Sequence, residues 1–127
     1  MDQGTQHRLT VTSHDNAGVT FVHLKGSLSA TTAEQGNKEM KKILDAGAKK
    51  LVLNLADVDY ISSGGIRVIM MTGKLLNSVQ GEIKISSAKG IVKEALQASG
   101  FDLLNRVYGG NIQLCSTDEE AVAAFKS

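Results

Sequence analysis

The sequence LVLNLADVDYISSGGIRVIMMTGKLL, residues 51–76, contains the change of pattern that decides the fold. It opens with leucines at alternate positions, which predicts a strand over residues 50–55 because strand side chains alternate between the two faces of a sheet. A short acidic turn, two serines and two glycines follow. From Ser63 to about Val79 the apolar residues recur at helical spacing. The stretch therefore predicts a strand and a helix joined by a loop that carries two serines.

Strand and helix patterns alternate along the rest of the chain in the order β-β-α-β-α-β-α-β-α. The first two strands are expected to form a hairpin whose turn lies in the cluster Asp15-Asn16-Ala17-Gly18. If the chain turns through Asn16 and Ala17, His23 lies opposite Thr10. The later elements are expected at about 31–47, 83–85, 89–99, 112–114 and from 116 or 117. This order predicts an α/β fold, with a mixed, mainly parallel sheet of about five strands, an N-terminal β-hairpin and about four helices packed against it.

The predicted helix over residues 63–79 has two adjoining apolar faces and one polar stripe. One face is formed by Ile66, Ile69, Met70, Gly73 and Leu76, and the adjoining face by Val68, Thr72, Leu75 and Val79. The remaining stripe consists of Arg67, Met71, Lys74 and Ser78. We therefore expect this helix to be the most buried of the four, with only the stripe turned outward.

Composition describes one domain and excludes several classes of partner. The 127 residues hold 14 basic and 13 acidic side chains, so the net charge of +1 argues against a nucleic-acid surface. Neither a membrane span nor a secretory signal is visible. The single cysteine, Cys115, favours a reducing cytoplasm. Residues 1–8 are expected to form a disordered N-terminal tail, and residues 9–127 the domain.

The serine loop allows three roles for a hydroxyl group. A hydroxyl at the start of a helix can cap a free backbone N–H, act as a nucleophile or carry a phosphate. The nucleophile-elbow pattern G-x-S-x-G fails around Ser63, because Ile61 stands at its first glycine position. All three histidines precede the serine, in the tail or in the hairpin. We therefore expect no enzymatic activity.

The other candidate groups favour structural roles. Asp57 and Asp59 follow the predicted strand and are expected to be turn residues that bond nearby backbone N–H groups. Cys115 is expected to be an inert thiol. No spacing of ligands predicts a metal site, and we expect no cofactor.

Three segments resemble the STAS domains, the family of the anti-sigma factor antagonists. The run D-x-x-Y-I-S-S-G-G-I-R-V-I at residues 57–69 resembles the loop between a strand and a helix that marks the family. LKGSLSATTAE at residues 24–34 is similar to the segment after the family's second strand. GEIKISSAKGIVKEALQASGFDLL at residues 81–104 is similar to its later strand, helix and corner. The resemblance covers roughly residues 7–126 and implies a STAS-like domain.

The resemblance also implies a function and a site. Ser63 matches the position of the serine that is phosphorylated in regulated members, and Ser62 is the alternative acceptor. Ser27, Ser29 and Ser62 stand where such members often carry acids. The implied partner is an anti-sigma factor or a GHKL-type serine kinase, with a serine phosphatase as a further partner, in the cytoplasm of a bacterium. The implied partner-binding residues are Ser62, Ser63, Gly64, Gly65, Arg67, Met71 and Lys74.

Two functions remain open at this point. In the first, the protein is a partner-switching regulator that binds an anti-sigma factor until Ser63 is phosphorylated. In the second, it is a STAS module without phosphorylation, which holds a small anion, a nucleotide or a lipid, or serves as a scaffold in a multiprotein complex.

Overall fold

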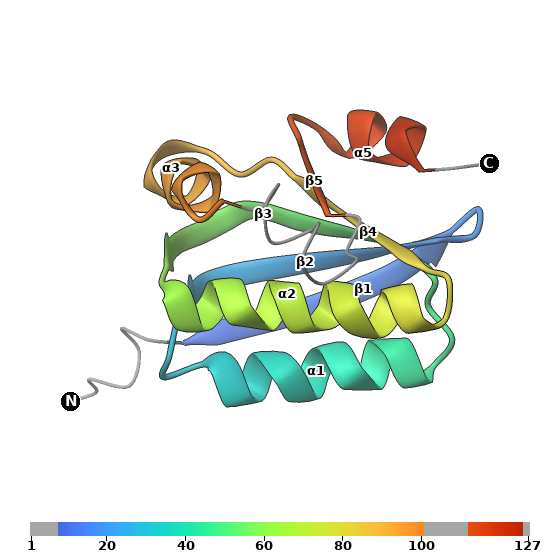
Figure 1. The fold of residues 1–127 in the computed structure, drawn as a ribbon, viewed down its shortest axis with the longest axis horizontal. Coiled ribbons are helices and arrows are strands. Elements are labelled where there is room, and N and C mark those ends of the chain that lie inside the picture. The colour runs from blue at the N-terminus through green and yellow to red at the C-terminus, as the bar shows by residue number, and fades with distance from the viewer. Residues whose placement is uncertain (1–7, 101–111, 126–127) are drawn as a thin grey trace.

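The computed structural model describes residues 8–100 and 112–125, and its elements follow the predicted order (Figure 1). The expected tail at residues 1–8, including His7 but not Arg8, lies outside the described residues. Residues 101–104, the end of the third segment that resembles the family, also lie outside them. The strands are β1 (Leu9–Asn16), β2 (Val19–Leu28), β3 (Lys50–Ile61), β4 (Glu82–Ser86) and β5 (Gln113–Cys115). The helices are α1 (Ala33–Asp45), α2 (Ser63–Ser78), α3 (Gly90–Ala98) and α5 (Asp118–Ala124).

The described strands form one sheet in the order β1-β2-β3-β4-β5. β1 pairs antiparallel with β2, and every later pair is parallel, which confirms the predicted mixed sheet with an N-terminal hairpin. Alternate residues of β3 face opposite sides of this sheet. Leu53 faces α1 and α2, where it lines one small space with Met40 and Ile69. Val52 packs with Ala121 of α5, so α5 covers the other face.

The hairpin turns within the predicted cluster, one residue later than a turn through Asn16 and Ala17. Its two turn residues are Ala17 and Gly18, with φ of 52° and 84°. Positive φ at both positions is the geometry of a type I′ turn, whose twist matches that of the flanking strands, and glycine adopts it without strain. The pairing therefore shifts, so that His23 lies opposite Thr12 and not opposite Thr10.

Strand β3 is twice as long as predicted, because it continues from Leu55 to Ile61 along β2. The pairing register with β2 shifts twice in this part, once between His23 and Lys25 and once between Gly26 and Ser27. Each irregularity moves the side chains out of strict alternation. The regular alternation of apolar residues in the sequence therefore stops after Leu55, although the strand itself continues.

Helix α2 is buried along the predicted main face, but the adjoining face is only half buried. Ile69 is 1% exposed and Leu76 is fully buried. Val68 and Thr72 are also buried, whereas Leu75 is 47% exposed. Val79 is 48% exposed and lies just beyond the helix, at its C-cap. The prediction of two buried faces was therefore wrong for Leu75 and Val79, which the neighbouring elements leave about half exposed.

Truncation of Ile69 tests the buried face of α2. We expect Ile69→Ala to lower the free energy of unfolding by about 2–5 kcal/mol, because the change leaves a cavity in the core. Leu75→Ala on the same helix is the matched control, and its cost should stay below about 1 kcal/mol because the side chain is half exposed. Urea denaturation followed by circular dichroism measures both. Equal midpoints for the two variants would contradict the assigned burial.

Candidate functional site

The two serines lie at the junction between β3 and α2. Ile61 is the last residue of β3, Ser62 is the N-cap of α2 and Ser63 is its first residue. Ser62 has an extended backbone, with φ of −120° and ψ of 179°, and its carbonyl oxygen accepts the first helical hydrogen bond from the Ile66 N–H at 2.9 Å. One residue therefore separates strand from helix, which fixes the direction in which Ser63 leaves the sheet.

Two glycines allow the loop between β2 and α1 to pack against the first turn of α2. A Cβ atom on Gly65 would lie 2.0 Å from the Leu28 carbonyl oxygen, and one on Gly64 would lie 2.9 Å from the Ala30 Cα. No side chain fits at such distances. The Ser62 N–H donates to the same Leu28 carbonyl at 3.1 Å, so the loop and the helix start are also joined by a hydrogen bond.

The two hydroxyl groups face different environments, and neither caps the helix. Within the described part of the chain, the Ser62 Oγ is buried without a hydrogen-bond partner, and α2 has no side-chain cap bond. Ser63 is exposed, and no hydrogen bond of its hydroxyl occurs within residues 8–100 and 112–125. The capping role is therefore not realised by either hydroxyl, whereas the Ser63 Oγ is open to a modifying enzyme.

The loop before α1 is held by its own hydroxyls. The Thr32 Oγ1 donates to the Ser27 carbonyl at 2.9 Å and accepts from the Ser29 N–H at 2.9 Å. The Ser29 Oγ contacts the Thr31 Oγ1 at 3.0 Å. Ser27 and Ser29, at positions where phosphorylated STAS members often carry acids, are both buried. The Ser29 side chain is therefore committed to a contact within this loop.

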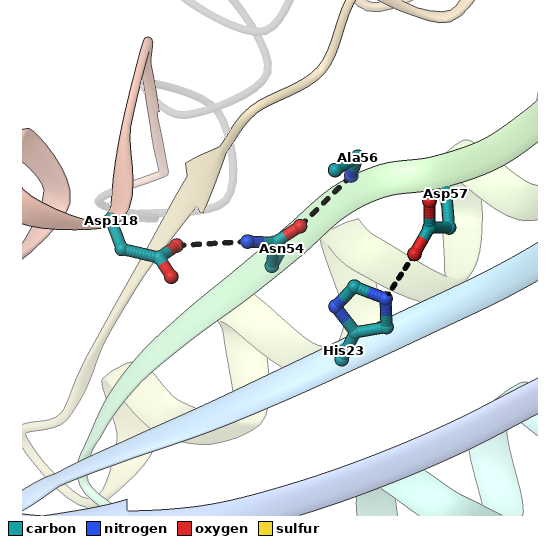
Figure 2. Close-up of polar contacts among 5 residues, drawn as sticks. All are labelled: His23, Asn54, Ala56, Asp57 and Asp118. Atoms are coloured by element: carbon teal, nitrogen blue, oxygen red, sulfur yellow. Dashed lines mark hydrogen bonds and ion pairs between the residues drawn. The ribbon is translucent and has the colours of Figure 1, made fainter.

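The two acids before the serines lie on β3, and the prediction that they are turn residues was wrong. An Asp57 carboxylate oxygen lies 2.7 Å from the Nε2 of His23 on β2 (Figure 2). The Asp59 carboxylate accepts a longer hydrogen bond, 3.4 Å, from the Ser27 hydroxyl. Because β3 continues beside β2, these acids meet side chains of the neighbouring strand and not nearby backbone N–H groups.

A second polar cluster anchors α5 to the sheet. The Asn54 side chain accepts from the Ala56 N–H at 2.9 Å and donates to the Asp118 carboxylate at 3.1 Å (Figure 2). The buried Ser86 hydroxyl donates to the same Asp118 oxygen at 2.5 Å. Asp118 thus accepts hydrogen bonds from side chains of β3 and β4. These bonds fix the start of α5 against the two strands.

The predicted outward stripe of α2 is exposed as expected. It consists of Arg67, Met71, Lys74 and Ser78. Sequence reasoning missed Tyr60, which is 48% exposed and lies two residues before Ser62. An exposed tyrosine beside a candidate docking surface is a frequent hot-spot residue. Tyr60 is part of the sequence motif, but the strand was expected to end at Leu55. The sequence pattern therefore gave no basis for predicting the direction of the Tyr60 side chain.

The described part of the chain offers little for covalent or metal chemistry. His14 stacks on Phe21 with ring centroids 5.2 Å apart, and His23 is paired with Asp57. No group of three or more His, Cys, Asp or Glu within the described ranges is arranged to hold a metal ion. None of the described helices has the length and hydropathy needed to span a membrane.

The Cys115 thiol is half-buried on β5. Burial raises its pKa above the ordinary value, the carboxylate of Glu120 adds to this rise, and Lys84 opposes it. A raised pKa keeps the sulfur protonated at neutral pH, and the thiolate is the reactive form. This thiol is therefore a poor nucleophile.

Comparison with known proteins gives one family. A family model described as the STAS domain matches residues 9–120. BtrV of Bordetella bronchiseptica, which is provisionally named an anti-sigma factor antagonist, is 34% identical over 110 residues. The match covers 87% of this chain and 89% of that protein.

Solved structures share the fold. The crystal structure of an anti-sigma factor antagonist from Mycobacterium paratuberculosis has a TM-score of 0.75 and 21% identity, covering 92% of this chain and 93% of that one. The phosphorylated form of the Bacillus cell fate determinant SpoIIAA has a TM-score of 0.62 and 17% identity, covering 90% and 97%. The three chains therefore have the same overall fold.

Removal of the Ser62 hydroxyl tests whether it caps α2. We expect Ser62→Ala to leave the free energy of unfolding unchanged or slightly higher, because a buried hydroxyl without a partner carries a desolvation cost. The control is Thr117→Ala, since the Thr117 Oγ1 does cap α5 by accepting from the Glu120 N–H at 3.1 Å. That variant should lose about 1 kcal/mol. A similar loss in Ser62→Ala, measured by urea denaturation, would identify Ser62 as a cap.

Proposed function

This chain belongs to the STAS domain family and is of the anti-sigma factor antagonist type, and we propose that it is a partner-switching regulator controlled by phosphate on Ser63. Unphosphorylated, it binds an anti-sigma factor or a GHKL-type serine kinase. Phosphorylated, it releases that partner, and a serine phosphatase restores binding. The reaction takes place in the cytoplasm, and the protein acts as a substrate and ligand and not as an enzyme.

The observation that carries the proposal is the exposure of Ser63 at the first position of α2. Among the described residues its hydroxyl makes no hydrogen bond that phosphorylation would have to break. The free N–H groups and the positive end of the helix dipole favour an anion at this position. The added charge of about −1.5 to −2 then lies at the surface and leaves the core unchanged.

The relatives support the same reading. BtrV carries the name of an antagonist of an anti-sigma factor, which favours such a partner for this chain. SpoIIAA exists in an unphosphorylated and a phosphorylated form, and the fold of this chain resembles both. Partner binding is proposed for the surface around the acceptor, formed by Ser62, Ser63, Gly64, Gly65, Arg67, Met71 and Lys74, to which Tyr60 is added. Ser62 is the alternative acceptor, although its hydroxyl is buried.

A second candidate function is a STAS module that binds a small ligand without phosphorylation. Two observations favour it. Ser27 and Ser29 offer buried hydroxyls in place of acids near the acceptor. An open cleft of about 700 Å³ lies at the other end of the domain, between the β1–β2 hairpin and the C-terminal end of α1, and Asp15, Lys42 and Lys49 are among its lining residues. A ligand in this cleft would bind far from Ser63.

Phosphorylation is tested with the cognate kinase and ATP. We expect the wild-type protein to gain one phosphate, and peptide spectra to place it on Ser63. Ser63→Ala should remain unmodified, because its neighbour Ser62 is buried. A phosphate that persists in Ser63→Ala moves the acceptor elsewhere, with Ser62→Ala as the next variant. Absence of any transfer would favour the ligand-binding module.

Partner release is tested by calorimetry with the purified anti-sigma factor. Ser63→Asp should weaken binding without unfolding the domain, and the effect should be partial because aspartate carries less charge than phosphoserine. Met71→Ala should weaken binding by about 1 kcal/mol or more if Met71 lies near the centre of the interface. Circular dichroism controls for folding. Equal affinities for the wild type and both variants would place the recognition surface elsewhere.

A further inference from the structure

Strand β1 lies at an edge of the sheet and turns one row of backbone groups away from it (Figure 1). In antiparallel pairing, the hydrogen bonds to the neighbouring strand fall on alternate residues. The Ser27 N–H donates to the Arg8 carbonyl at 2.9 Å, so Arg8 and the even-numbered residues after it bond to β2. The odd-numbered residues from Leu9 to Asp15 therefore point their N–H and C=O groups to the outer side.

A side chain of α1 covers the first of these outward residues. The Gln35 Nε2 donates to the Leu9 carbonyl at 2.8 Å, as expected for a carbonyl that points away from β2. Within residues 8–100 and 112–125, the outward N–H and C=O groups of Val11, Ser13 and Asp15 have no hydrogen-bond partner. We call these three residues, with their outward backbone groups, the β1 edge.

The β1 edge lacks the features that commonly prevent the addition of a further strand. Natural proteins blunt their edge strands with proline, lysine, bulges or short length. The chain contains no proline, β1 contains no lysine, and all eight residues of β1 pair with β2 without a bulge. The described part of β5, at the other edge, has three residues. The sheet is therefore open to a further strand along β1.

A cleft lies beside this edge, on the α1 side of the sheet. Leu9 packs in the core between the sheet and α1, so the odd-numbered residues of β1 face that helix. The cleft of about 700 Å³ is lined by Ser13 and Asp15 from β1 and by Glu39 and Lys42 from α1, among others. Side chains of paired residues lie on the same face of a sheet, so the side chain opposite Ser13 on an added strand would enter this cleft. Free backbone groups beside a side-chain pocket are the arrangement that binds extended peptides by strand addition.

The charges of the cleft select the side chain that enters it. Lys42 and Lys49 both line the cleft and are exposed, and neither has an ion-pair partner within the described ranges. Of the two acids in the lining, Glu39 is half-buried, and Asp15 accepts a hydrogen bond from the Thr20 hydroxyl at 2.7 Å. The lysines are therefore the charges that remain to be complemented, and a carboxylate matches them.

We propose that the β1 edge binds an extended segment of another protein, which adds to the sheet as an antiparallel strand and places a carboxylate side chain opposite Ser13, within reach of Lys42. Antiparallel pairing bonds both outward groups of each free residue of β1. On the open face of the sheet the segment lies beside Thr12 and His14, where β-branched side chains pack well. This second binding surface lies at the other end of the domain from Ser63 and is separate from the proposed switch.

A second copy of this chain fits the β1 edge less well. The antiparallel pairing that uses all three free residues places Ser13 opposite the same serine of the other copy. Ser13 and Lys42 line one cleft, so the two-fold axis would also bring two Lys42 side chains together on one face of the sheet. An extended segment of a different protein avoids this repulsion.

Binding is tested with a fluorescein-labelled peptide of sequence TVTETVT, blocked at both ends, by fluorescence anisotropy. Its glutamate is designed to lie opposite Ser13, with the valines on the same face and the threonines on the other. A methyl group on the glutamate backbone nitrogen should weaken binding about tenfold or more, because this N–H points at β1. The matched control carries the methyl group on the nitrogen of the preceding threonine. That N–H points away from β1, so the affinity should stay within about twofold of the unmodified peptide.

Variants of the protein test the same contact from the other side. Ser13→Pro removes an N–H that β2 does not use, so the domain should stay folded by circular dichroism, while the peptide affinity falls about tenfold or more. Lys42→Glu should weaken binding about fivefold or more, and Lys42→Arg should retain it within about twofold. The charge control is Lys93→Glu, which should bind like the wild type because Lys93 is exposed on α3 and does not line the cleft. If Ser13→Pro unfolds, the methylated peptides and the two Lys42 variants decide the question.

Three outcomes would overturn the proposal. The first is equal affinity of the two methylated peptides, and the second is absence of saturable binding of TVTETVT up to about 1 mM. The third is a wild-type dimer in sedimentation experiments that Ser13→Pro dissociates, since the edge would then belong to a second copy. The peptide assay involves neither a kinase nor an anti-sigma factor, so its result is independent of the proposed function.

Discussion

The contact of the β2–α1 loop with the first turn of α2 is the constraint on which the serine site depends. Gly65 lies so close to the Leu28 carbonyl that a methyl group there would overlap it, and the Ser62 N–H donates to the same carbonyl. Leu28 is the last residue of β2, Ser62 directly follows the last residue of β3, and these two strands pair with each other. The start of α2 is therefore fixed by the sheet, and a single linking residue leaves it little freedom. As a result Ser62 turns its hydroxyl inward, and Ser63 lies outside.

This fixed junction also explains why one helix can serve the core and a surface at once. The buried side of α2 is held by Ile69 and Leu76, and Gly73 lets the Ile112 side chain approach the helix backbone. On the opposite side Ser63, Arg67 and Met71 are exposed. A charge added at Ser63 or a truncated side chain at Met71 should therefore cost little folding free energy. The proposed regulation at the surface and the stability of the core thus depend on different sides of the same helix.

The sequence determines more of the element order than of the element boundaries. The order of strands and helices, the mixed sheet and the outward position of Arg67 and Lys74 follow from periodicity, because they depend on local pattern. The extent of β3 does not, since two shifts of register remove the alternation beyond Leu55. The exposure of Leu75 and Val79 depends on how far the neighbouring elements cover α2, which no local pattern records. The same limit applies to Tyr60, whose exposure at the end of β3 follows from tertiary structure.

The serines show a further difference between what the sequence and the structure reveal. Ser62 and Ser63 are equivalent in composition, and both stand at a helix start where capping is the common role. The family resemblance distinguishes them by position, and the structure distinguishes them by environment, because only the Ser63 hydroxyl reaches the surface. Ser27 and Ser29 also show that a position in the sequence does not fix the environment of a side chain. Both residues occupy positions where acids are frequent in related proteins, but both are buried. The Ser29 hydroxyl contacts Thr31, and the Ser27 hydroxyl donates to Asp59 on β3.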